Sequence, residues 1–291
     1  VTTKLGMTLI GLNLRRPTHE FRRRPARAGR LERRVMRFLR ENMEKRIVCW
    51  FSCGAASAVA TKLAIAENAG RLPLVVARCI VREEHPDNDR FAADCESWFG
   101  VPITNLINAK YDGSIYEVFR KESYISGVAG APCTRLLKKE VRHKFEKVTD
   151  RHVFGYCAEE QGRWDDFLDA NNIAAVAPLI DRGLEHSDCL AMVHDAGIEL
   201  SVMYRLNYKH NNCRGCCKAT GPGYWNKVRV DFPDYFDRMA NESRRLGVKV
   251  IRIGEERVFL DELKPGTGNY RDEPEVQCGI FCEMAKRELA A

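Results

Sequence analysis

From about residue 46 onward, the hydrophobic and polar positions of this chain follow two alternating patterns. Short apolar runs predict buried strands, and longer segments whose apolar residues recur every three to four positions predict helices. The predicted strands cover residues 46–51, 72–81, 101–106 and 152–156. The predicted helices cover residues 58–69, 89–99, 135–145 and 231–247. Because strands and helices alternate, we predict an α/β fold with a Rossmann-like, mainly parallel sheet.

The character of the sequence changes near Tyr204. Cys, Gly, Asn and Lys concentrate between residues 207 and 224, which suits a loop folded around a ligand or metal. A helix follows, with Asp231 as the expected N-cap and Gly247 at its C-terminal end. We therefore predict three parts, which are a basic N-terminal arm (1–45), a nucleotide-binding α/β domain (46–205) and a cysteine-rich C-terminal metal module (206–291).

Composition and charge narrow the class of protein. Of the 291 residues, 45% are hydrophobic and 30% are charged, which is typical of a globular chain. No apolar run approaches the roughly 18 residues of a membrane span, so we expect no membrane partner. The net charge of +7 is uneven, because residues 1–46 hold 14 Lys or Arg against 4 Glu, and the remaining 245 residues therefore carry −3. The arm is a segment that contacts nucleic acid, a targeting peptide, or translated sequence without function.

Five of the twelve cysteines form two short groups near the C-terminus. This pattern is typical of metal binding in a reducing compartment, so we expect a cytoplasmic protein. Cys213, Cys216, Cys278 and Cys282 are the predicted ligands of one centre, and Cys217 lies close without ligating. Thiolates at this spacing suit a structural zinc ion or a [4Fe–4S] cluster. Unliganded or redox-active thiols remain a third interpretation.

The segment 52–57 reads Ser-Cys-Gly-Ala-Ala-Ser and lies between a predicted strand and a predicted helix. A helix N-terminus presents unpaired N–H groups and the positive end of the helix dipole, which favour an anion. Ser52 and Ser57 add hydroxyl groups, and Gly54 allows the backbone to approach phosphate oxygens. The segment lacks the Gly-Lys-Ser/Thr of a Walker A loop. An ordinary turn of small residues is the alternative.

The segment 50–57 resembles the Ser-Gly-Gly-x-x-Ser PP-loop of the adenine nucleotide alpha-hydrolase superfamily. That superfamily includes phosphoadenosine phosphosulfate (PAPS) reductases and AMP-forming ATP pyrophosphatases. Further segments are similar to PAPS reductase-like proteins of phages and bacteria, namely residues 85–91, 131–138, 154–163, 178–180, 212–218, 223–227 and 278–282. The resemblance covers roughly residues 46–283.

The chain departs from the family pattern at two places. Cys53 replaces the second glycine of the PP-loop, and a Cβ there is costly wherever the backbone needs a positive φ. In the C-terminal Cys-Gly motif, Gln277 precedes Cys278 where the reductases have Glu, and Phe281 stands where they have His. The second departure keeps reactions other than PAPS reduction open.

The resemblance also implies roles for charged residues. Arg135, Lys138 and Arg163 would hold phosphate or sulfate oxygens, for which the planar fork of Arg is well suited. Glu160 would orient Arg163 or contact a ribose. Asp87 would help to hold Mg²⁺ if the substrate is ATP.

Two cysteines are candidate catalytic groups. Cys133 precedes a basic helix, whose dipole and neighbouring cations favour a thiolate, so it could carry a persulfide or contact substrate. A buried structural role for Cys133 remains open. Cys278 is a nucleophile by the resemblance to the reductases and a metal ligand by its spacing.

Three functions follow from these observations. The first is thiol-dependent reduction of a sulfonucleotide such as PAPS. The second is ATP-dependent adenylation of a nucleic acid or small molecule, after which a thiol or persulfide donor supplies sulfur and AMP leaves. The third is a non-catalytic nucleotide- or nucleic-acid-binding protein with a structural metal. An Mg²⁺-dependent AMP product would indicate the second, and thiol-dependent sulfite release the first.

Overall fold

The computed structural model describes residues 45–127 and 130–274. The chain divides into two units, Val1–Asn42 and Met43–Ala291, and all described residues belong to the second. The predictions for residues 1–44, and those for Cys278 and Cys282, therefore lie outside the described residues. Across the described residues, no helix combines the length and the apolar character that crossing a bilayer requires.

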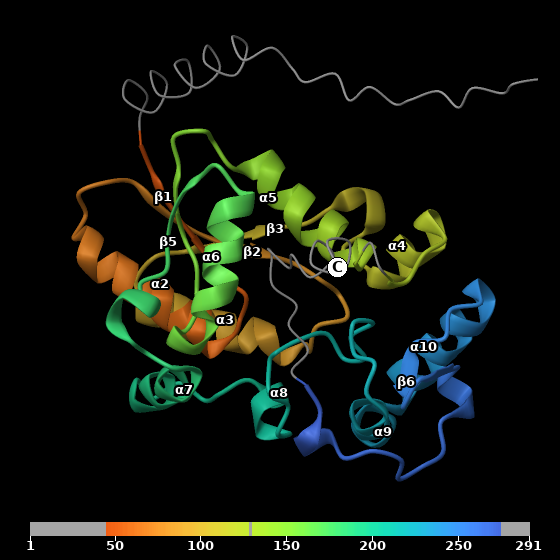
Figure 1. Cartoon of the computed structure of the whole chain (residues 1–291). Coiled ribbons are helices and arrows are strands. Elements are labelled where there is room, and N and C mark those ends of the chain that lie inside the picture. The colour runs from red at the N-terminus through yellow and green to blue at the C-terminus, as the bar shows by residue number, and fades with distance from the viewer. Residues whose placement is uncertain (1–44, 128–129, 275–291) are drawn as a thin grey trace, which may run out of the picture. The chain divides into compact units, whose positions relative to one another are not determined.

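Five parallel strands form the main sheet of the described chain, in the order β3-β2-β1-β4-β5 (Figure 1). Their bounds are β1 (Ile47–Trp50), β2 (Leu74–Cys79), β3 (Ile103–Leu106), β4 (Arg151–Val153) and β5 (Ala174–Val176). The predicted α/β class with a parallel sheet is confirmed. Strand order reverses beside β1, so the carboxyl ends of β1 and β4 flank a topological switch point, where ligands bind in such sheets.

Helices cover both faces of this sheet. One hydrophobic cluster packs α2 (Ala55–Asn68), α3 (Asp87–Phe99) and α7 (His186–Asp195) against one face. A second cluster packs α5 (Glu140–Phe145) and α6 (Gln161–Ala170) against the other face. The central strand β1 is therefore buried along its whole length, which explains why it appears in the sequence as a continuous apolar run. The edge strands β3 and β5 keep exposed residues.

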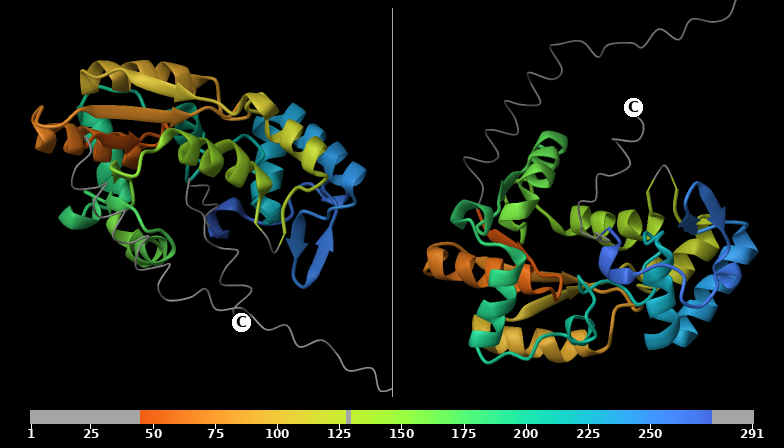
Figure 2. Two further views of the ribbon diagram at one scale, coloured as in Figure 1. Left: turned by 90° about the horizontal axis from the view of Figure 1, so that it is seen from above. Right: turned by 60° about the horizontal axis from the view of Figure 1, so that its bottom comes forward.

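The chain beyond the sheet is mostly helical. It contains α8 (Val202–Arg205), α9 (Pro222–Asp231), α10 (Pro233–Leu246), and an antiparallel hairpin of β6 (Ile251–Ile253) and β7 (Glu256–Val258). Figure 2 shows α9 and α10 beside α4 (Ile115–Glu122). A third hydrophobic cluster joins Phe119 of α4 to Trp225 of α9 and Met239 of α10. This cluster includes residues from both sides of the predicted boundary at 205/206, which stays a prediction.

The remaining helical segments are short. The 3₁₀ turns are η1 (Ala109–Tyr111), η3 (Ala158–Glu160), η4 (Ile180–Arg182), η5 (Leu260–Glu262) and η6 (Tyr270–Asp272), and η2 (Thr134–Lys139) is a π-helical turn. The predicted helix 135–145 is therefore a π-turn followed by α5. The prediction that Asp231 is an N-cap was wrong, because Asp231 ends α9 and Phe232 precedes α10. Gly247 does end α10, with a left-handed φ of 67°.

Candidate nucleotide-binding site

Residues 52–57, called the PP-loop segment here after the motif they resemble, lie between the end of β1 and the start of α2, as predicted. The Ser57 hydroxyl accepts the Ser52 backbone N–H at 3.0 Å and donates to the Gly54 carbonyl at 2.9 Å. Ser57 is buried, so its hydroxyl organises the turn from inside. Ser52 is exposed, with its Oγ 3.1 Å from the Ser57 Oγ. The Ser52 hydroxyl is therefore the one that a ligand in solution can reach.

Cys53 adopts the left-handed conformation that its place in the loop requires. Its φ is +59°, which for a residue with a Cβ costs about 1–2 kcal/mol. The side chain is fully buried, and its Sγ lies 3.6 Å from the Asn88 carbonyl oxygen. Burial raises the pKa of the Cys53 thiol. The side chain thus points into the core, and the cost of replacing glycine is backbone strain rather than an obstructed anion site.

Gly155, two residues after the end of β4, lies directly against the PP-loop segment. A Cβ on Gly155 would lie 2.7 Å from the Ser57 backbone nitrogen and α-carbon and 2.8 Å from the Ala56 carbonyl carbon. These distances are below any normal contact, and the neighbours are backbone atoms that cannot rotate away. The glycine therefore permits the close approach of the two loops that follow β1 and β4.

Three residues that the motif analysis did not predict surround the start of α2. The Tyr204 hydroxyl accepts the Ala55 backbone N–H at 3.4 Å and lies 3.5 Å from His186 Nε2. The rings of His186 and His210 are 5.6 Å apart. These side chains come from α8, α7 and the following loop, outside every segment of the resemblance, and no periodic pattern marks them. They add ring nitrogens and a phenol near the N-terminal end of α2.

Asp87 has protein partners at the start of α3. Its carboxylate binds Arg90 with oxygen–nitrogen distances of 2.8 and 2.9 Å and accepts the Val202 backbone N–H at 2.9 Å. The hydrogen bond from Arg90 is the largest of the effects that lower the pKa of Asp87. Asp87 thus connects α3 with α8, and its predicted contact with Mg²⁺ would have to compete with these bonds.

Lys138 and Arg135 have different surroundings although both belong to η2. Lys138 is buried, and its Nζ lies 3.1 Å from Glu84 Oε1. The other Glu84 oxygen accepts from the Asn88 side chain at 3.3 Å, and Asn88 contacts Cys53. The Lys138–Glu84 pair is therefore linked to the PP-loop. Arg135 is exposed and lies 3.6 Å from Glu122.

Glu160 and Arg163 form an ion pair just beyond β4. Glu160 also accepts the Cys157 backbone N–H at 3.1 Å, and the Arg163 guanidinium lies 5.3 Å from the centre of the Tyr156 ring. The geometry suits the predicted orienting role of Glu160. Its contact with a ribose remains a prediction.

The cysteine loop, defined here as residues 207–221, buries three thiols in one hydrophobic cluster with Cys133. The Cys133 and Cys217 sulfurs are 3.7 Å apart. The Tyr224 hydroxyl accepts the Cys216 backbone N–H at 2.7 Å, and the Trp225 indole donates to the Ala219 carbonyl at 2.8 Å. Tyr224 and Trp225 are buried, and these hydrogen bonds support the loop from inside the cluster.

Two of the four predicted metal ligands, Cys213 and Cys216, lie among the described residues. Cys213 and Cys216 are buried with the spacing that thiolate ligands to a metal use, so their chemistry suits zinc or an iron–sulfur cluster. Among residues 45–127 and 130–274, no group of three His, Cys, Asp or Glu side chains converges as a metal site. The other two predicted ligands, Cys278 and Cys282, lie outside the described residues.

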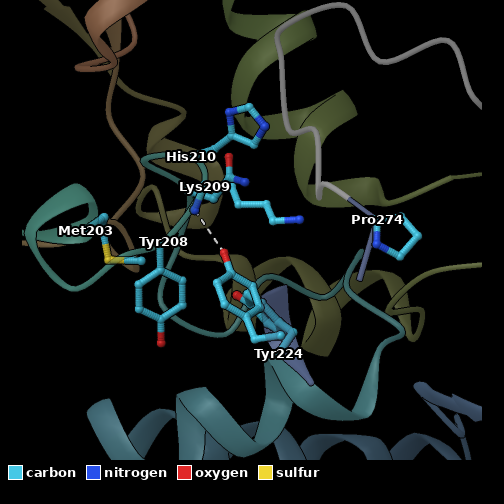
Figure 3. A pocket seen from close by; sticks show the side chains of 8 residues that line it. Met203, Tyr208, Lys209, His210, Tyr224 and Pro274 are labelled. Atoms are coloured by element: carbon cyan, nitrogen blue, oxygen red, sulfur yellow. Dashed lines mark hydrogen bonds between the residues drawn. The ribbon is translucent and has the colours of Figure 1, made fainter. Parts of the chain in front are cut away.

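A small hollow opens beside His210 (Figure 3). Figure 3 shows Tyr208 and Tyr224 lining it together with Met203 and Pro274. The Lys209 backbone N–H donates to the Tyr270 hydroxyl at 2.9 Å, which closes one side. His210 and Tyr224 both line the hollow, and Tyr224 bonds to Cys216 of the cysteine loop.

Comparison of the chain with protein-family models and with curated proteins finds no match. The proposed function therefore rests on the geometry of the candidate site and on the sequence motifs.

Proposed function

We propose that this chain is a PAPS reductase-like enzyme that binds an adenine nucleotide at residues 52–57 for thiol-dependent reduction of a sulfonucleotide. The observation that carries the proposal is the position of this segment at the topological switch point of the sheet. The start of α2 provides N–H donors there, the exposed Ser52 provides a hydroxyl, and Gly155 keeps the opposite wall close. A phosphate group is the ligand that such a turn favours.

The paired sulfurs of Cys133 and Cys217 support a two-thiol reaction. In the proposed first step, the Cys133 thiolate attacks the sulfonate sulfur, the sulfur–oxygen bond to the nucleotide breaks, and a nucleotide phosphate leaves. Cys133 then carries an S-sulfonate. The Cys217 thiolate attacks the Cys133 sulfur, sulfite leaves, and a Cys133–Cys217 disulfide forms. The two thiols supply both electrons, and an external dithiol returns the disulfide to two thiols.

Charged residues near these groups would hold the oxygens of the substrate. Lys138 and Arg163 would bind phosphate or sulfate, each after exchanging part of its present carboxylate contact for the ligand. Arg135 is exposed and follows Cys133 by two residues, which suits a contact with the sulfonate. The metal centre, if its four cysteines converge, would hold the cysteine loop in place. As a nucleophile, Cys278 is the alternative to Cys133.

The first prediction tests this reaction. Purified protein supplied with PAPS and a dithiol should release sulfite, and Cys133→Ser should abolish the release because serine cannot form the S-sulfonate. Cys95→Ala is the control, since Cys95 is a buried thiol on α3 in a different hydrophobic cluster from Cys133. Sulfite would be measured together with AMP formed from ATP and Mg²⁺.

The outcomes separate the three hypotheses. Absence of dithiol-dependent sulfite in the wild-type protein contradicts reduction of PAPS. Mg²⁺-dependent AMP formation would instead establish the AMP-forming sulfur-transfer reaction. Nucleotide binding without either product would leave a non-catalytic binding protein. Full sulfite release by Cys133→Ser would transfer the role of nucleophile to Cys278.

A further inference from the structure

Asn211 of the cysteine loop is bonded directly to the PP-loop. Its side-chain Nδ2 donates to the Cys53 carbonyl oxygen at 2.6 Å and to Asn88 Oδ1 at 2.8 Å. The residue is only 9% exposed, so both bonds are shielded from water. Asn211 precedes the first cysteine of the loop, Cys213, by two positions. A single side chain thus joins the phosphate-binding turn to the cysteine cluster.

The bond to Cys53 determines how the turn presents its donors. Carbonyl and following N–H point in opposite directions across a trans, planar peptide group. Because Asn211 holds the Cys53 carbonyl, the Gly54 N–H is turned away from the Asn211 side chain. Cys53 has a strained φ of +59°, so the orientation of this peptide depends on outside support. Asn211 is the described side chain that donates to its carbonyl.

The cysteine loop is also bonded to the segment that follows β2. The Arg214 backbone N–H donates to the Glu83 carbonyl oxygen at 2.9 Å, and its guanidinium donates to the Glu84 carbonyl oxygen at 3.2 Å. These bonds hold the cysteine loop in place beside the sheet. Because Asn211 belongs to this loop, a displacement of the loop would also move Asn211 away from Cys53. The Asn211 Oδ1 is buried and reaches no donor among the described residues. A buried acceptor without a donor costs about 1–3 kcal/mol of stability. Because an unsatisfied buried group calls for an explanation, we infer that Asn211 is placed here for the ligand site.

We propose that Asn211 is a positioning residue that couples the cysteine loop to nucleotide binding at the PP-loop. When the loop is in its folded position, Asn211 orients the Cys53–Gly54 peptide for the phosphates of the ligand. Coupling of two binding events is reciprocal, so a bound nucleotide in turn holds the cysteine loop closed. The inference rests on the proposed function in that the ligand is an adenine nucleotide.

The second prediction tests the coupling through thiol reactivity. In the wild-type protein, ATP or adenosine 3′,5′-bisphosphate, which carry no sulfonate for Cys133 to attack, should slow the alkylation of Cys217 by N-ethylmaleimide, measured by mass spectrometry. Cys217 is the loop thiol outside the predicted set of metal ligands. Alkylation of Cys95 should slow less, because global stabilisation alone would protect all cysteines alike. Asn211→Ala should weaken nucleotide binding about tenfold, the effect of losing about 1.4 kcal/mol, and should remove the nucleotide dependence of loop alkylation.

The control variant is Asn241→Ala, which removes an exposed asparagine of α10 and should leave both measurements unchanged. A wild-type protein that binds neither nucleotide contradicts the proposed function itself. A wild-type protein that binds nucleotide without slower loop alkylation overturns the coupling alone, as does protection that persists in Asn211→Ala at saturating nucleotide.

Circular dichroism and a thermal melt show whether Asn211→Ala folds. If it does not fold, hydrogen–deuterium exchange of residues 207–217 in the wild-type protein decides the question. Nucleotide should slow exchange there more than in α10, and equal exchange with and without nucleotide would overturn the proposal.

Discussion

Position 155 needs glycine because a Cβ there would clash with neighbouring backbone atoms. Its backbone does not have a positive φ that would itself favour glycine. A Cβ at position 155 would lie 2.7 Å from the Ser57 backbone nitrogen and 2.8 Å from the Ala56 carbonyl carbon. Because glycine has no Cβ, the strand-to-helix turn lies directly against the segment after β4. No alternative rotamer relieves a clash between a Cβ and backbone atoms. The residue therefore controls how closely the two walls of the candidate site approach each other.

The third prediction follows from this contact. Gly155→Ala should destabilise the protein by about 1–3 kcal/mol, as overpacking does, and should weaken nucleotide binding because the PP-loop must move. Gly162→Ala on α6 is the matched control, since nothing lies within 4 Å of its added Cβ. The control should leave binding intact and stabilise the helix by up to about 1 kcal/mol. Urea unfolding and calorimetric nucleotide binding measure both effects, and equal behaviour of the two variants would contradict the argument.

Residues of the site differ in how far the sequence could predict them. The position of Ser52, Gly54 and Ser57 in a strand-to-helix turn was predictable, because the turn is local and its flanking patterns are strong. Tyr204 and Asn211 were not predictable as partners of this turn. Each contacts it across more than a hundred residues of chain, and neither belongs to a periodic or motif pattern that indicates a partner.

Among the secondary structure elements, the prediction succeeded for the strands β1, β2 and β3 and for the helices α2, α3 and α10, whose apolar patterns are long. Strands β1 and β2 lie inside the predicted ranges, because continuous apolar runs in an α/β pattern indicate central parallel strands. The short strand β5 (Ala174–Val176) and the helices α4, α6, α7 and α9 were missed. Three-residue strands carry little pattern, and α9 lies in a segment whose Gly and Cys content resembles a loop.

Strands β1 and β4 meet through a buried histidine, which gives the fourth prediction. The Trp50 indole N–H donates to His152 Nδ1 at 3.0 Å, so this nitrogen must be unprotonated. Burial lowers the pKa of His152 below its ordinary value of 6.5, although Glu146 and Asp150 oppose the shift. The unfolded chain then binds a proton that the folded chain excludes. The contribution of neutral, buried His152 to the free energy of unfolding is therefore present above pH 6.5 and is lost as the pH falls below this value.

Unfolding free energy should therefore decline between pH 7.5 and pH 5.5, and less steeply in His152→Asn. Asparagine can place an acceptor where His152 Nδ1 accepts from Trp50, and it does not titrate in this range. The variant loses packing and should be less stable at pH 7.5, so the slope rather than the absolute stability is the measurement. Equal slopes in urea titrations of both proteins would show that His152 does not carry the pH dependence.

At the scale of the described molecule, the cysteine loop packs in the hydrophobic cluster of α4, α9 and α10, which is distinct from the two clusters that cover the sheet. Cys213, Cys216 and Cys217 lie in this cluster with Phe119 of α4, from the other side of the predicted boundary at 205/206, which stays a prediction. Local composition predicts the loop, but it does not show which core the loop packs on. Contacts such as that of Cys133 with Cys217 join positions 84 residues apart, and no single-sequence pattern encodes them.

The fifth prediction concerns metal content. Buried thiols that bind a metal do so as thiolates, and burial alone opposes the charged form, so a metal would stabilise this loop strongly. We predict that anaerobically purified protein contains iron with acid-labile sulfide, or one equivalent of zinc, held by Cys213, Cys216, Cys278 and Cys282. Cys216→Ala should lose most of the metal and melt at a lower temperature. Cys95→Ala, on α3, should keep the metal.

Elemental analysis and the visible spectrum of both variants provide the test. A brown protein that becomes colourless on Cys216→Ala indicates the cluster, whereas a colourless wild-type protein with stoichiometric zinc indicates a structural ion. The Tyr224 hydroxyl bonds to the Cys216 backbone, so Tyr224→Phe separates support of the loop from ligation. It should retain metal while lowering the melting temperature. Unchanged metal content in Cys216→Ala would contradict the proposed ligand set, and the loop thiols would then be assigned to redox chemistry with Cys133.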